Sequence, residues 1–321
     1  MRIPRFAPWP CLVALAAGCA SGATDLPPPP DLMRAPFSAP HSSFFHSALE
    51  IPVLESAHTL GEGQTQLQLR GSSATSTDSG TADGQPQDFD GRFDEVLVTD
   101  MAWGAVDGLE FGARATISGW AEHVDSFALL DADGSAIVTG EQELISGLGA
   151  SERHLGLSEL VFDARQTLDS SPDAEWAGLI SLKIPVASKR DLTNAGTYDF
   201  NAGLLRSSVS GNRTLHANLG AGVPLGEETL FVDEADVDLH PWIYAGVGSN
   251  WLLREDLSWG LQLEGNTGAF GDVEFLDGSP LTLLGGLRKA AGSWALELEA
   301  GTGLTGQSYD WLVGLGATRR Y

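Results

Sequence analysis

Side chains that commonly perform acid–base or nucleophilic chemistry are sparse in this chain and do not form a catalytic spacing. The 321 residues include seven histidines and two cysteines. One H-x-S spacing occurs at His41–Ser43, while His216 and His240 occupy positions at which alternation predicts an inward-facing side chain. No G-x-S-x-G motif and no Cys/His metal spacing is present. We therefore expect no enzyme activity, no metal site and no cofactor, with a lipid hydrolase as an alternative.

A larger group of side chains, either ionisable or carrying an amide, occurs at every second position within predicted strands. The predicted lumen-lining residues are Glu110, Arg114, Glu159, Asp163, Arg165, Lys183, Asp199, Asn218, Gln262, Glu264, Arg288, Glu297 and Glu299. Their signs are mixed but lean acidic. Such a set can line a narrow, water-filled pore that mildly prefers cations, or it can fill a closed lumen as a network of ion pairs. The sequence leaves both alternatives open.

The elements that place these residues are short segments in which apolar residues alternate with small or polar ones. In residues 109–121, for example, Leu109 and Phe111 share one face while Glu110 and Arg114 share the other. Twelve such segments are predicted: 64–75, 92–104, 109–121, 155–167, 176–186, 198–208, 214–224, 239–253, 258–267, 281–289, 294–301 and 309–321. A period of two is typical of strands with one face in lipid and the other in water.

The links between these segments alternate in length. Tight links are predicted at Ala105–Gly108, Leu168–Glu175, Ser210–Arg213, Arg254–Leu257 and Ala290–Ser293, and longer links at 76–91, 122–154, 187–197, 225–238, 268–280 and 302–308. No stretch approaches the ~18 consecutive apolar residues of a transmembrane helix, so only a closed barrel could cross a membrane. The predicted fold class is all-β: a single antiparallel transmembrane β-barrel of about 12 strands, with short periplasmic turns and long external loops.

Aromatic residues mark the ends of the predicted outward faces. Those at the tight-link end are Trp103, Trp176, Trp251, Trp259, Trp294 and Tyr321, and Trp311 lies at the other end. Because amphipathic rings prefer the headgroup level, we expect two girdles in contact with outer-membrane lipid and lipopolysaccharide. The chain ends on Tyr321 directly after a strand, which is the form of C-terminus that the barrel-assembly machinery reads in related proteins.

The first residues of the chain are typical of an export signal. Residues 1–18 combine two arginines with a short apolar stretch, which predicts a signal peptide. Leu15–Cys19 resembles the lipobox of bacterial lipoproteins and would make Cys19 a lipidation site. Ordinary cleavage after Ala20 or Ala23 is the alternative.

A Pro-rich lead-in over residues 19–60 follows this signal and precedes the predicted barrel, residues 61–321. Residues 24–40 contain most of these prolines and are expected to form an extended tether. Residues 41–60 are of mixed apolar composition and are expected to be either a periplasmic segment or a partial plug.

The charge of the chain limits its partners. A formal charge of −25 leaves nothing to neutralise a run of phosphates, so nucleic acid is excluded as a partner. Acidic residues gather in the long links, but Asp131–Gly134 places glycine at the fourth position, whereas a Ca²⁺ loop requires it at the sixth. We interpret these residues as solvated charge. The link 122–154 is partly apolar and is expected either to constrict the lumen or to cap the barrel mouth.

The layout of residues 45–321 resembles an uncharacterised family of bacterial outer-membrane proteins known only as a domain of unknown function. The shared features are a Pro-containing lead-in at Leu49–Val53, an Ala/Leu/Gly run at Ala57–Gly63, the pair Asp94–Glu95, and the start of a long loop at Gly119–Asp125. The resemblance implies a β-barrel in the outer membrane of a Gram-negative bacterium. It implies no activity, because the family has none assigned.

The expected role is a narrow, passive channel for small solutes with a mild preference for cations. A structural or interaction protein of the envelope with a filled lumen is one alternative. A lipid hydrolase of the outer membrane is another. The sequence does not indicate an oligomeric state.

Overall fold

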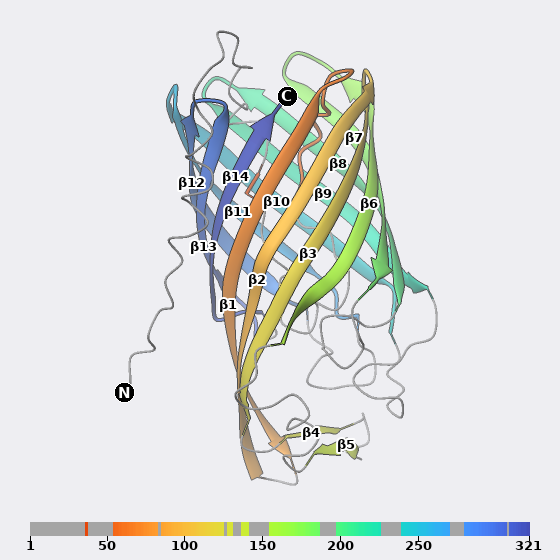
Figure 1. Cartoon of the computed structure of the whole chain (residues 1–321), viewed down its shortest axis with the longest axis vertical. Helices are drawn as coiled ribbons and strands as arrows, with labels where there is room; N and C mark the ends of the chain where they lie inside the picture. Colours follow the sequence, from red (N-terminus) through yellow and green to blue (C-terminus); the bar gives the residue numbers. More distant parts are fainter. Residues whose placement is uncertain are drawn as a thin grey trace.

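A computed structural model describes residues 36–37, 54–82, 85–124, 127–130, 136–140, 154–186, 197–225, 239–269, 279–306 and 308–321. Within these residues, twelve strands form one closed antiparallel barrel (Figure 1). The bounds are β1 Thr65–Ala82, β2 Gln85–Val106, β3 Leu109–Val124, β6 His154–Ser170, β7 Ala174–Pro185, β8 Tyr198–Ser210, β9 Arg213–Leu225, β10 Trp242–Arg254, β11 Leu257–Asn266, β12 Leu281–Ala291, β13 Trp294–Gly303 and β14 Trp311–Arg320. The predicted fold class, an all-β transmembrane barrel of twelve strands, is confirmed.

The two ends of the barrel differ in the length of their connections. At one end, which we call the short-turn end, strands are joined by two or three residues, namely 107–108, 171–173, 211–212, 255–256 and 292–293. Gly108 has a φ of 78°, the left-handed conformation that tight hairpin turns favour. The opposite, long-loop end carries the longer connections, as the alternation of link lengths predicts, except that β1 and β2 are joined there by residues 83–84 alone.

The barrel closes where the last strand meets the first. β1 and β14 are paired along residues Gln66–Thr75 of β1. At the short-turn end, the amide of Tyr321 donates to the carbonyl of Thr65 at 2.8 Å, and the amide of Thr65 donates back at 3.1 Å. This closure removes both free edges of the sheet, which a bilayer would otherwise leave without hydrogen-bond partners.

Side chains alternate between the two faces of the barrel wall. In β8, Tyr198, Phe200 and Leu204 are exposed on the outer face, whereas Asp199 and Asn201 are buried inside. An apolar outer face suits lipid contact, and a polar inner face needs partners within the lumen. No helix in the described part of the chain is long and apolar enough to cross a membrane.

The structure corrects the predicted loop over residues 76–91. β1 continues to Ala82 and β2 begins at Gln85, and the two strands remain paired to their ends. β3 accompanies β2 as far as Val124, opposite Phe89. The three strands extend past the barrel rim as a narrow ribbon (Figure 1). The sequence of residues 76–91 lacks the period of two from which the other strands were predicted.

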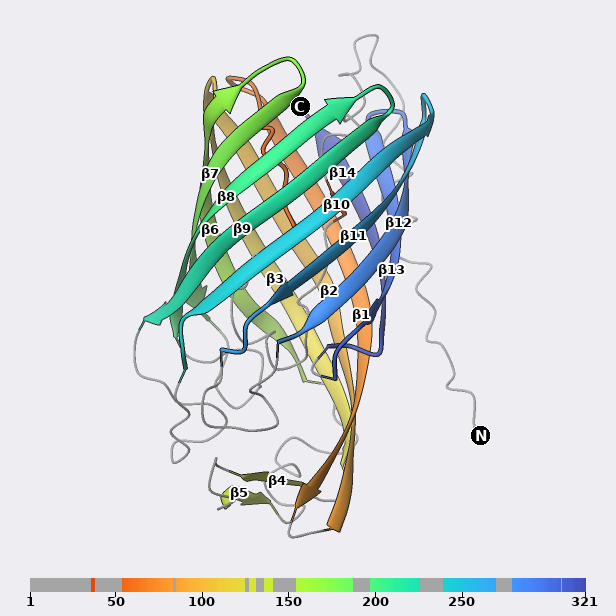
Figure 2. The same ribbon diagram turned by 180° about the vertical axis from the view of Figure 1, so that it is seen from behind.

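The long link 122–154 contains a further hairpin. β4 (Phe127–Leu130) pairs with β5 (Ala136–Gly140), separately from the barrel. Figures 1 and 2 both place this hairpin near the end of the ribbon, beyond the barrel mouth. The expectation that this link constricts the lumen is therefore wrong for β4 and β5, and residues 141–153 lie outside the described residues.

Candidate functional site

The lumen contains chain that precedes the barrel. Residues 54–60 run along the inner wall before the turn at Gly61–Gln64 leads into β1, and Pro36–Phe37 also lie inside (Figure 2). We call residues 36–37 and 54–60 the inner segment. Of the two forms expected for residues 41–60, a periplasmic segment or a partial plug, the described residues adopt the plug.

Backbone amides of the inner segment donate hydrogen bonds to inward-facing side chains. The bonds run from Leu54 N to Glu264 Oε2 at 3.2 Å, from Ala57 N to Ser207 Oγ at 2.9 Å, and from Leu60 N to Glu110 Oε2 at 2.8 Å. A buried amide without an acceptor is costly, and the inner segment belongs to no sheet that could supply one. The polar wall therefore provides the acceptors that keep this segment inside.

Phe37 occupies a seat made by two glycines. Gly260 of β11 pairs with Gly286 of β12, and a Cβ on either would lie 2.4 or 2.8 Å from the Phe37 ring, respectively. The guanidinium of Arg288 lies 5.0 Å from the centre of that ring. Gln262 accepts from the Phe37 amide and donates to its carbonyl, both at 3.0 Å. The ring and the backbone of Phe37 are thus both fixed to the wall.

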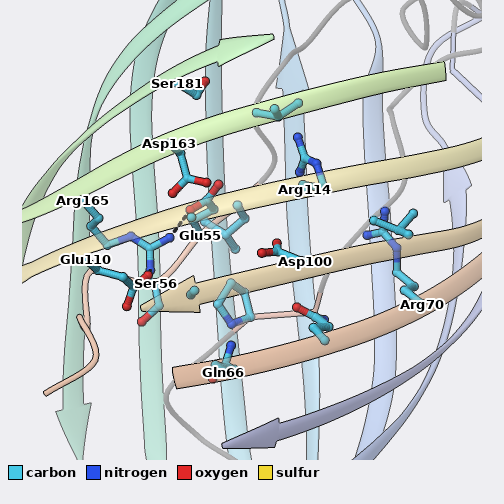
Figure 3. A pocket seen from close by; sticks show the side chains of 17 residues that line it. Glu55, Ser56, Gln66, Arg70, Asp100, Glu110, Arg114, Asp163, Arg165 and Ser181 are labelled. Carbon is cyan, nitrogen blue, oxygen red and sulfur yellow. Dashed lines mark hydrogen bonds and ion pairs between the residues drawn. The ribbon is translucent and has the colours of Figure 1, made fainter. Parts of the chain in front are cut away.

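Ion pairs hold the rest of the inner segment. Arg165 bonds to Glu55 of this segment and lies 3.2 Å from Glu110 of the wall (Figure 3). His58 Nδ1 lies 2.5 Å from Glu175 Oε2. Because Arg165 is largely buried, its charge depends on these two carboxylates for compensation.

Side chains of the wall itself also fill part of the lumen, next to β9 and β10. Trp242 and Tyr244 of β10 point inward, are buried, and lie over Gly222 and Gly220 of β9. The Trp242 indole donates to Asn201 Oδ1 at 3.1 Å. Glycine at these positions leaves room for rings that a Cβ would displace.

A histidine predicted to face inward is joined to two polar partners. Ser207 Oγ lies 2.9 Å from His216 Nδ1, and Asn250 Nδ2 lies 3.4 Å from His216 Nε2. These three residue types also occur in hydrolases. Here all three are buried, and none of them lines the cavity described below. Ser207 Oγ accepts a hydrogen bond from the Ala57 amide. These residues therefore hold the inner segment against the wall.

A cavity of about 140 Å³ remains beside the inner segment, against the wall formed by β1, β2, β3 and β6 (Figure 3). The lining residues that can carry a charge are Glu55, Asp100, Glu110, Asp163, Arg70, Arg114 and Arg165. Within the described part of the chain, no group of His, Cys, Asp or Glu side chains could hold a metal ion. The cavity is therefore a polar space with both signs of charge.

The residues predicted to line the lumen all lie on its inner face, in two groups. Glu110, Arg114, Asp163 and Arg165 line the cavity. The others are buried against the lumen contents, namely Glu159, Lys183, Asp199, Asn218, Gln262, Glu264, Arg288, Glu297 and Glu299. Lys183 pairs with Asp199 at 3.2 Å, and Arg288 pairs with Glu297.

Three ionisable cavity residues are missing from the predicted set. Arg70 and Asp100 lie on the inner faces of β1 and β2, and the alternation Val98, Asp100, Ala102 was the signal that could have identified the second. Glu55 lies before the barrel, where no strand pattern assigns it a face.

The predicted girdle residues lie on the outer face. Trp103, Trp176, Trp251, Trp259, Trp294 and Tyr321 are near the short-turn end, and Trp311 is at the other. Trp103 stacks on Phe111 at 6.3 Å between ring centres, and Trp251 stacks on Trp259 at 4.4 Å. Cys19 lies outside the described residues, so its lipidation stays a prediction.

A closed barrel with an apolar outer face and a polar, occupied lumen defines this chain as a transmembrane β-barrel protein. A solved structure of the same fold is the COG4313 outer membrane channel from Pseudomonas putida F1, with a TM-score of 0.59, 13% identity, and coverage of 83% of this chain and 98% of that one. The NanC porin matches with a TM-score of 0.48, 6% identity, and coverage of 79% of this chain and 98% of that one.

Comparisons of the sequence alone find no such relatives. No protein-family model matches the chain, and no curated protein sequence matches it. The resemblance to an uncharacterised outer-membrane family therefore stays a prediction, and the structural likeness supports the fold.

Proposed function

We propose that this protein is a passive channel for small polar solutes in the outer membrane of a Gram-negative bacterium, and that the inner segment closes it in the state seen here. The observation that carries this proposal is the polar cavity between the inner segment and β1, β2, β3 and β6. A barrel that served only as a scaffold would gain stability by filling this space with apolar side chains. The COG4313 barrel from Pseudomonas putida F1 is described as a channel, which agrees with this role.

Opening would widen the cavity by moving the inner segment. The wall around it carries acidic and basic side chains close together, such as Asp100 and Arg114 at paired positions of β2 and β3, so water and small ions would find partners of both signs. Four carboxyl and three guanidinium groups line the cavity, counting Glu55. A mild preference for cations would require these carboxyl groups to be ionised once water fills the open lumen.

Planar-bilayer recordings test the channel. We expect the full-length protein to show rare, small conductance steps, because the inner segment occupies the lumen. Deletion of residues 24–60 should give frequent and larger steps. Arg165→Gln should give intermediate opening, because it removes the cation that joins Glu55 to Glu110. A reversal potential measured in a salt gradient reports the cation preference.

One result decides against a channel. The deletion variant must first run as a folded, heat-modifiable barrel. If it is folded and its conductance stays at the lipid background, the lumen is closed by the wall itself. The protein would then be a structural envelope protein with a filled lumen, a role that the buried Lys183–Asp199 and Arg288–Glu297 pairs would favour.

A further inference from the structure

The outer face of the barrel carries its charge at one end. Among strand residues with described side chains, the outward-facing cations are Arg206, Arg213, Arg254, Lys289 and Arg319, all toward the short-turn end, and Asp169 is the one carboxylate there. The turns at this end add the exposed carboxylates of Asp107, Asp173 and Glu255. The outward faces of the strands therefore present mainly cations at this rim, next to acidic turns.

Three of these cations lie over aromatic rings of a neighbouring strand. The distances from guanidinium carbon to ring centre are 5.3 Å for Arg206 on Trp176, 5.2 Å for Arg213 on Trp251, and 5.7 Å for Arg319 on Trp294. Arg319 also lies 4.6 Å from the Tyr321 ring. We call the first three contacts the Arg–Trp clamps. They occur on β7–β8, β9–β10 and β13–β14, and so are spread around the barrel.

The clamps leave guanidinium donors available to a ligand. Within the described residues, none of the three arginines forms an ion pair. Arg213 Nε donates to Ser249 Oγ at 2.8 Å, which uses one of its five donors. A ring under the guanidinium restricts its orientation, so less entropy is lost when an anion binds.

We propose that the Arg–Trp clamps bind the phosphodiester groups of anionic phospholipids in the leaflet at the short-turn end. Tryptophan rings lie at the headgroup level of a bilayer, and this level holds phosphates. Guanidinium groups bind phosphate through paired N–H donors more specifically than a point charge does. Outward guanidinium groups at this level are placed to pair with the phosphates of a negatively charged leaflet.

Fluorescence quenching in vesicles tests the clamps directly, because their tryptophans are the reporters. The full-length protein is reconstituted in mixtures of phosphatidylglycerol and phosphatidylcholine, of which one is brominated in its acyl chains. The quenching gives the binding constant of the anionic lipid relative to the zwitterionic one. We expect a preference for phosphatidylglycerol of about fivefold at low salt, and a loss of that preference at high salt.

Variants separate the clamps from general attraction. Arg206→Gln, Arg213→Gln and Arg319→Gln combined should bring the relative constant to about one. Arg254→Gln is the matched control, because Arg254 lies at a neighbouring short turn, is exposed, and is 3.9 Å from Asp256 instead of lying over a ring. It should leave the preference within about a factor of two of the original protein. If the triple variant does not fold, Arg213→Gln and Trp251→Leu alone should each lower the preference.

Three outcomes would overturn the clamps as a lipid site. One is an equal preference for both lipids in the unchanged protein. Another is an unchanged preference in the folded triple variant or in both single variants. The third is complete loss of the phosphatidylglycerol preference when inorganic phosphate is added, which would show that the arginines bind a free anion and not a lipid. None of these outcomes depends on whether the barrel conducts ions.

Discussion

The buried pair Lys183–Asp199 shows how the barrel wall tolerates charge inside. Both side chains are 0% exposed, the ammonium nitrogen lies 3.2 Å from Asp199 Oδ2, and Thr197 donates to Asp199 Oδ1 at 2.7 Å. Desolvating two ions costs about as much as their attraction returns. The pair therefore adds little net stability. Removing one partner alone is nevertheless costly, because it leaves the other charge buried and unpaired.

We predict that Lys183→Met lowers the free energy of unfolding by about 3–5 kcal/mol, because it leaves the Asp199 carboxylate buried without its cation. In the Asp199→Asn background, the same substitution should cost about 2 kcal/mol less. Urea unfolding in lipid vesicles, followed by tryptophan fluorescence, measures both values. Arg254→Gln, in an exposed pair, should change stability by about 1 kcal/mol or less. Equal costs of Lys183→Met in both backgrounds would show that the two charges are not coupled.

At the level of elements, the strands could be predicted from the sequence and the inner segment could not. The alternation in 109–121, for example, correctly gave β3, because its two faces meet lipid and a polar lumen. Residues 54–60 carry no such period, since three of their amides find acceptors on three different strands. Which side chain meets Leu54 or Phe37 depends on the shear of the closed barrel, a quantity that no local pattern encodes.

The glycine seat of Phe37 gives a prediction about this element. A Cβ at position 260 would lie 2.4 Å from the ring and 2.3 Å from Asn250 Oδ1, so Gly260→Ala should displace Phe37. We expect about 1–3 kcal/mol of lost stability at this contact, and so roughly tenfold faster hydrogen exchange at the Phe37 amide. Mass spectrometry of peptides that contain residues 36–37 measures this rate.

Gly285→Ala is the control for this substitution. Gly285 is next to the seat on β12, but its Cβ would meet only Leu261 and a carbonyl oxygen at 3.6 Å, which is ordinary contact. Exchange at the Phe37 amide should be unchanged. If both variants exchange alike, the seat does not hold the ring.

At the scale of the whole molecule, one side of the lumen is packed and the other side contains the cavity. The side next to β9–β12 is packed by Trp242, Tyr244 and Phe37, and the side next to β1, β2, β3 and β6 holds the cavity. The seam between β1 and β14 lies on the cavity side and joins the two ends of the barrel sequence. Closure of the barrel therefore depends on residues near the C-terminus.

We predict that deletion of Arg319–Tyr321 impairs insertion into the outer membrane while leaving export intact. The deletion removes the paired hydrogen bonds between Tyr321 and Thr65 and the Arg319 contact with Trp294. It also removes the terminal aromatic residue that the assembly machinery is expected to read. Heat-modifiable mobility in outer-membrane fractions measures insertion. Normal mobility of the truncated protein would contradict the prediction, and a truncation within residues 24–35 serves as the control.

The course of the inner segment has a mechanical consequence. Its contacts follow one another along the chain, from Phe37 through Leu54 and Ala57 to Leu60. A pulling force on the residues before Phe37 would load these contacts in series and peel them away singly. The wall strands share each load over many parallel hydrogen bonds, from Gln66 to Thr75 at the seam alone. A modest tension could therefore empty the lumen while the barrel around it stayed whole.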